Sequence, residues 1–157
     1  MFIDQQPMKT TLAFFLADIL AGGAACAQAP AAAPAPASAD HGADERAATD
    51  VATRWLAVLD SGNYPDAWRQ LAPAAQSMVA QGAWNATMPK ARGTFGAVKS
   101  RTLKGAEYTN AMPGAPAGEY VGVAFDTVFA NGAKAVETVV PMRTPDGGWK
   151  VSGYFVN

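Results

Sequence analysis

Four strand-like segments follow one another in the second half of the chain, and this succession most constrains the fold. Each segment alternates in polarity or is rich in β-branched and aromatic residues; they cover residues 98–109, 119–130, 134–144 and 148–156. Asn131-Gly132 separates the second from the third, and Pro145-Asp146-Gly147-Gly148 separates the third from the fourth; both are typical of tight turns. We therefore expect a four-stranded antiparallel meander.

The preceding half of the domain has helical periodicity. Residues 44–62 place a stripe of apolar side chains at helical spacing: Val51, Trp55, Val58 and Leu59. Acidic residues at the start of this segment and Gly62 directly after its end are typical of helix termini. Pro65 and Pro73 each suit the first position of a shorter helix. Residues 83–93 predict a fourth helix, which Pro89 should kink or destabilise. Helices followed by strands indicate an α+β domain with helices packed on one sheet face.

The N-terminal 27 residues have the pattern of an export signal. Lys9 precedes an apolar stretch, and Ala25-Cys26-Ala27 offers a cleavage site after Ala27. We therefore expect a periplasmic or secreted protein. Attachment of a lipid at Cys26 is the alternative to cleavage after Ala27. Translation starts at either Met1 or Met8. The apolar stretch is too short and interrupted for a spanning helix, so no stable membrane insertion is expected after cleavage.

An Ala/Pro-rich tract, residues 28–43, follows the signal and holds no apolar side chain large enough to build a core. We expect it to be an extended, mobile spacer. The single α+β domain is then residues 44–157.

Charge and residue content exclude several function classes. Without residues 1–27 the chain carries 11 basic and 11 acidic residues, and no nucleic-acid motif is present, so no nucleic-acid partner is expected. His41 and Cys26 are the only His and Cys and lie outside the domain, which excludes nucleophile–His pairs and His/Cys zinc sites. No phosphate-binding glycine loop is present, and we expect no cofactor, metal or catalytic signature.

Six short stretches resemble the bacterial "domain of unknown function 4019" family over residues 47–157. They are WLAVLDSGNYPDAW, GTFGAVKSR, PGAPAGEY, FDTVFAN, AVETVVPMR and GGWKVSGYF, in that order. The resemblance implies an exported domain without assigned activity. It also implies a cone-shaped fold similar to nuclear-transport-factor-2-like, ketosteroid-isomerase-like or cystatin-like proteins, which host enzymes, binders and scaffolds alike. Pro89 departs from the uninterrupted helix expected there.

Glu137 is the most informative candidate residue, because it lies in an apolar strand. A buried carboxylate needs a partner, and Arg92, Arg101 and Arg143 are the available cations. We favour a structural Glu–Arg pair over a functional carboxylate. Asp126 shares the thinner face of its strand with Tyr120 and is interpreted as a solvated carboxylate, with a general base as the alternative.

Aromatic and basic residues supply the other binding candidates. We expect Trp55 in the core, whereas Trp68 and Trp84 either pack in the core or line a pocket between helices and sheet. Alternation along 149–156 places Trp149, Val151, Gly153 and Phe155 on the core face. It leaves Tyr154 on the opposite, mixed face as a binding candidate. The segment from Ala67 to Ala106 contains no acidic residue and six basic ones: Arg69, Lys90, Arg92, Lys99, Arg101 and Lys104. We interpret them as a solvated face, with an anion-binding site as the alternative.

Three functions remain open from the sequence. The first is a non-catalytic exported domain that binds a small ligand or an envelope protein. The second is a ketosteroid-isomerase-like or hydrolase-like enzyme that uses Asp126 or Glu137 with Tyr108 or Tyr154. The third is an assembly module that forms a homodimer by packing sheet against sheet.

Overall fold

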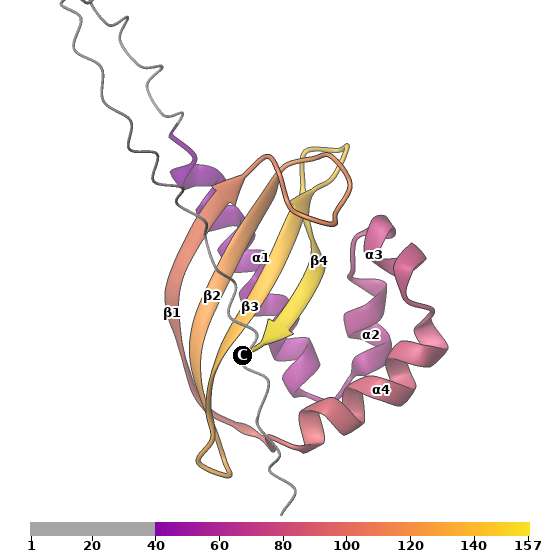
Figure 1. The fold of residues 1–157 in the computed structure, drawn as a ribbon, viewed down its shortest axis with the longest axis vertical. Coiled ribbons are helices and arrows are strands. Elements are labelled where there is room, and N and C mark those ends of the chain that lie inside the picture. The colour runs from indigo at the N-terminus through magenta and orange to yellow at the C-terminus, as the bar shows by residue number, and fades with distance from the viewer. Residues whose placement is uncertain (1–39) are drawn as a thin grey trace, which may run out of the picture. The chain divides into compact units, whose positions relative to one another are not determined.

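The computed structural model describes residues 40–157, which form four helices followed by four strands (Figure 1). The elements are α1 (Gly42–Asp60), α2 (Tyr64–Arg69), α3 (Pro73–Met78), α4 (Gln81–Gly93), β1 (Val98–Thr109), β2 (Tyr120–Phe129), β3 (Lys134–Arg143) and β4 (Trp149–Val156). The predicted α+β class and the order of its elements are confirmed. The predicted signal peptide and most of the Ala/Pro tract lie outside the described residues.

The sheet is an antiparallel meander in the order β1-β2-β3-β4. It is curved, with α1 lying along one face and α2–α4 gathered beyond β4, which gives the expected cone-like arrangement (Figure 1). The predicted hairpins are present, and their glycines have the positive φ angles that tight turns require: 85° at Gly132 and 82° at Gly147. Local turn chemistry thus sets the strand order.

The two edge strands, β1 and β4, are protected to different extents against pairing with a further strand. In β1, register shifts accommodate Lys99 and Lys104 as extra residues, and bulges with lysines discourage pairing with another strand. At the β4 edge, Leu71 forms a single parallel bridge with Val151, and the Ala72 N–H donates to the Val151 carbonyl at 2.7 Å. Beyond Val151 no strand of the described chain pairs with this edge.

Two helix predictions are refined by the structure. Helix α1 begins at Gly42, and His41 stacks on Tyr108 with ring centroids 3.6 Å apart, so the end of the predicted spacer belongs to the domain. Helix α4 continues through Pro89, which is exposed and lacks the N–H that an interior residue donates. Among residues 40–157, no helix combines the length and the apolar character needed to cross a bilayer.

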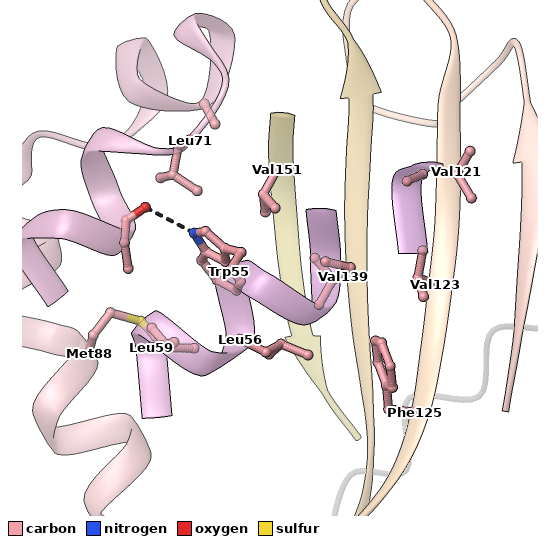
Figure 2. Close-up of a cluster of buried hydrophobic side chains, with 14 residues drawn as sticks. Trp55, Leu56, Leu59, Leu71, Met88, Val121, Val123, Phe125, Val139 and Val151 are labelled. Atoms are coloured by element: carbon pink, nitrogen blue, oxygen red, sulfur yellow. Dashed lines mark hydrogen bonds between the residues drawn. The ribbon is translucent and has the colours of Figure 1, made fainter. Parts of the chain in front are cut away.

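The core fills the space between α1 and the concave face of the sheet (Figure 2). Trp55, Leu56 and Leu59 of α1 are at most 1% exposed, and they pack with buried side chains of β2, β3 and β4. The Trp55 indole N–H donates to the Ala67 carbonyl at 2.9 Å and so connects α1 to α2. The predicted core position of Trp55 is confirmed.

The predicted facing of β4 is wrong beyond Val151. Pro141 pairs with Val151 while Val140 pairs with Gly153, so Ser152 is an extra residue and the register shifts. A bulge of this kind reverses the alternation after it. Tyr154 therefore packs against the core, and Phe155 is 56% exposed on the opposite face.

Candidate functional site

Glu137 lies at the centre of a buried cluster of charged and polar groups. It is completely buried, and both of its carboxylate oxygens accept two partners. Oε1 accepts hydrogen bonds from Arg92 at 2.7 Å and from the Tyr154 hydroxyl at 2.5 Å. Oε2 accepts hydrogen bonds from Arg101 at 2.7 Å and from the Thr127 hydroxyl at 2.6 Å. The expected Glu–Arg pair is confirmed, with two arginines in place of one.

Asp60, the last residue of α1, completes this ion cluster. Arg101 donates to Asp60 at 2.6 Å, and Arg92 forms a short ion pair with the same carboxylate. A carboxylate at a helix C-terminus is disfavoured by the helix dipole, so two guanidinium groups offset that cost. Two carboxylates and two guanidinium groups leave the cluster electrically balanced, which is the condition for burying charge at tolerable cost.

The cluster shifts its pKa values away from those useful in acid–base catalysis. Burial alone raises the pKa of Glu137, but hydrogen bonds from Thr127 and Tyr154 and the charge of Arg101 outweigh it and lower that pKa. Burial and the hydrogen bond to Glu137 raise the pKa of Tyr154 far above its usual value. A general base and a general acid at neutral pH need the opposite shifts. Each carboxylate oxygen of Glu137 already accepts two hydrogen bonds within the cluster.

These shifts predict how stability depends on pH. The lowered pKa of Glu137 contributes stability that is present above its unfolded value and is lost as pH falls through the folded pKa. The raised pKa of Tyr154 contributes stability that is present below about 10, the unfolded value, and is lost as pH rises further. Urea midpoints should therefore be nearly constant from about pH 6 to 9 and fall on both sides. Tyr154→Phe should reduce the decrease of the urea midpoint at alkaline pH. If the decrease is the same in this variant as in the wild type, Tyr154 is not its cause.

The other predicted site residues are spread over the domain. Asp126 is 60% exposed and lies 3.5 Å from the Lys104 ammonium, as its interpretation as a solvated carboxylate predicts. Arg143 does not reach Glu137 and pairs with Asp44 and Glu119. Of the six bases between Ala67 and Ala106, two are inside the ion cluster, so they form no continuous anion-binding face.

The helical tryptophans differ in what they line. Trp68 donates its indole N–H to the Val79 carbonyl at 2.9 Å and packs against the core, without lining a cavity described below. Trp84 donates to the Tyr64 carbonyl at 2.9 Å and also forms part of a cavity wall. The pocket alternative is therefore met by Trp84 alone.

An apolar groove runs along β4, between that strand and α3. It consists of two adjoining cavities of about 180 and 250 Å³ that share five residues: Ala75, Met78, Ser152, Gly153 and Phe155. The loop between β1 and β2 and the outward side chains of β3 close the first cavity, while Trp84 and Met88 of α4 close the second. We call this feature the methionine-lined groove, because it contains all four methionines between residues 40 and 157: Met78, Met88, Met112 and Met142.

The chemistry of the groove is uniformly uncharged. Its lining contains no Asp, Glu, Lys, Arg or His. Two of the three large hydrophobic side chains exposed in the described domain lie in it, Met78 at 77% and Phe155 at 56%. Methionine side chains adapt to differently shaped apolar partners. An exposed apolar concavity of this kind is suited to binding.

Sequence reasoning missed Asp60 and the groove. An acid at the last helical position, beside Gly62, was the only local signal for Asp60. The only signal for the groove was the presence of methionines at the end of a helix (Met78), in a loop (Met112) and near the end of a strand (Met142). In the described part of the chain, no group of three or more His, Cys, Asp or Glu side chains could hold a metal ion.

Comparison with known proteins identifies the family. The structure of Aln2 from a Streptomyces species is similar over 76% of this chain and 92% of that chain, at 13% identity and a TM-score of 0.46. No curated protein sequence matches the chain. The family model described as "Protein of unknown function (DUF4019)" matches residues 51–154, from the middle of α1 to β4. The chain therefore belongs to the DUF4019 family.

Proposed function

We propose that this domain is a non-catalytic binding module of the bacterial envelope, exported by its N-terminal signal. It holds an extended, uncharged apolar segment of another envelope protein in the methionine-lined groove. The observation that carries the proposal is the coincidence of this uncharged groove with the unpaired part of the β4 edge.

The backbone of β4 offers hydrogen-bonding groups along the groove. Asn157 and Val136 exchange backbone hydrogen bonds of 2.8 and 3.0 Å. In an antiparallel ladder such pairs alternate with pairs whose N–H and C=O groups point away from the neighbouring strand. By this alternation, the backbone groups of Tyr154 and Val156 point away from β3 and are available to an added strand. An extended peptide can satisfy them, as in β-strand addition.

The electrostatics of the groove select the kind of segment. A charged side chain placed among Met78, Phe155 and Trp84 would lose its hydration without gaining an ion partner, because no Asp, Glu, Lys, Arg or His lines the groove. A segment that alternates apolar and small uncharged side chains can both pair with β4 as a strand and avoid placing a charge in the groove, since alternate side chains of a strand point to the same side.

The other two functions receive less support. For the enzyme, a carboxylate and a tyrosine do lie within hydrogen-bond distance, Glu137 and Tyr154, but the Glu137 oxygens are occupied and the pKa shifts of the two groups are unfavourable for acid–base catalysis. For the sheet-packed homodimer, the outer face of β1 and β2 carries exposed charged groups, including Glu107, Lys104 and Asp126. Burying them between two sheets would be costly.

Peptide binding tests the proposal directly. The probe is a short peptide of alternating Thr and Val, acetylated and amidated, and its partner is the purified mature protein. Met78→Asp and Phe155→Asp should each weaken binding by about tenfold or more, because each places a carboxylate in the groove. Leu103→Asp is the matched control: Leu103 is 49% exposed on β1 and should leave binding unchanged.

Three outcomes would contradict the proposal. The first is no binding of the peptide. The second is equal loss in the groove variants and the Leu103 variant. The third is binding of the apolar dye Nile red, but not of the peptide, which would favour a small apolar ligand as the occupant.

A further inference from the structure

We propose that Met78 is a modification site at which oxidation of the thioether to the sulfoxide closes the groove to its apolar occupant. This inference rests on the proposed binding function and assigns a means of regulating it. Met78 is the last residue of α3 and belongs to both cavities of the groove, so a change in its polarity affects the whole binding surface.

Exposure singles out Met78 among the four methionines. Its side chain is 77% exposed, whereas Met88 is 9% exposed and Met112 and Met142 are partly buried. A solvent-borne oxidant must reach the sulfur, so exposure controls the order of reaction. No cysteine lies between residues 40 and 157 to react first. Met78 is therefore the most accessible soft nucleophile of the domain.

The reaction needs a peroxide as the oxidant, with hydrogen peroxide as the simplest member. A sulfur lone pair attacks one peroxide oxygen, an S–O bond forms and the O–O bond breaks. Sulfur loses two electrons and becomes a sulfoxide, while the peroxide is reduced to water after proton transfer. The product is polar and chiral where the thioether was apolar.

The groove cannot accommodate the new oxygen when it is occupied. A sulfoxide oxygen is a strong acceptor, and burying it beneath an apolar segment requires a donor. Every side-chain donor of the lining already serves a neighbour: Trp84 bonds the Tyr64 carbonyl, Tyr120 the Pro116 carbonyl, Ser152 the Val140 carbonyl, and Tyr154 Glu137. The oxidised side chain should therefore remain in water and exclude the ligand.

The test treats the mature protein with hydrogen peroxide and maps each methionine by peptide mass spectrometry. Met78 should be oxidised first and Met88 last. Affinity for the Thr/Val peptide should fall about tenfold when Met78 is oxidised, and methionine sulfoxide reductases with a thiol reductant should restore it. The affinity of Met78→Leu for the peptide, compared with the value for the same variant before treatment, should not fall after treatment. The free energy of unfolding of the treated protein should stay unchanged.

The outcomes separate the two proposals. Failure of the untreated protein to bind the peptide overturns both. Equal binding before and after oxidation of Met78 overturns the modification site alone. The modification site is also overturned if Met78→Leu loses affinity as wild type does, if another methionine reacts first, or if the treated protein unfolds.

Discussion

Replacing Glu137 with alanine is expected to lower the free energy of unfolding by about 3–5 kcal/mol, the cost of leaving buried charges without their partner. Arg92 and Arg101 both donate to this carboxylate inside the protein, and each would lose part of its compensation. Thr127 and Tyr154 would also lose their acceptor. A loss of this size is a large fraction of the stability of an ordinary domain. Urea unfolding followed by circular dichroism measures it.

Matched variants distinguish a cluster effect from a general effect of removing a carboxylate. Asp126→Ala removes an exposed carboxylate from the adjacent strand and should change stability by less than about 0.5 kcal/mol. Glu137→Gln keeps the shape and should fold if Glu137→Ala does not. A double-mutant cycle on Glu137 and Arg101 should give a coupling energy of about 1 kcal/mol or more. Absence of coupling would contradict the pairing.

Trp55→Ala is the second change with a large expected effect, a loss of about 3–5 kcal/mol for emptying a core position filled by a large aromatic side chain. The ring is 1% exposed and contacts the Tyr154 ring edge to face, with centroids 5.4 Å apart. It also carries the hydrogen bond that connects α1 to the Ala67 carbonyl. Removing it creates a cavity and leaves a backbone acceptor without its donor.

Two controls divide the Trp55 effect into its parts. Trp55→Phe retains most of the apolar contact and should cost less than Trp55→Ala, mainly through the lost hydrogen bond and a smaller cavity. Trp68→Ala removes an indole that is only partly buried and should also cost less. Equal losses for Trp55→Ala and Trp68→Ala would show that burial does not determine the effect.

The ion cluster and the methionine-lined groove lie in different parts of the domain. Asp60 ends α1 and Arg92 lies near the end of α4, so the cluster lies where those helices meet the sheet, with Glu137 buried and Asp60 partly exposed. Tyr154 connects the cluster to the core, because its hydroxyl donates to Glu137 and its ring contacts Trp55. The methionine-lined groove lies outside this cluster, along β4, and we assign binding to it because its lining is apolar and uncharged.

Local sequence determined the elements and their order. Periodicity located α1, and the turns at Gly132 and Gly147 required hairpins, because helix spacing and turn conformation depend on neighbours in the chain. The local sequence also predicted a cationic partner for Glu137, since burying a carboxylate alone in an apolar strand is costly.

The tertiary structure alone decided which partners meet. It chose Arg92 and Arg101 over Arg143 and added Asp60, although these residues lie far apart in the chain. It also placed a bulge at Ser152, which turned Tyr154 inward and Phe155 outward and so created the groove wall. Neither result follows from local sequence, because long-range pairing and strand register depend on how distant segments pack.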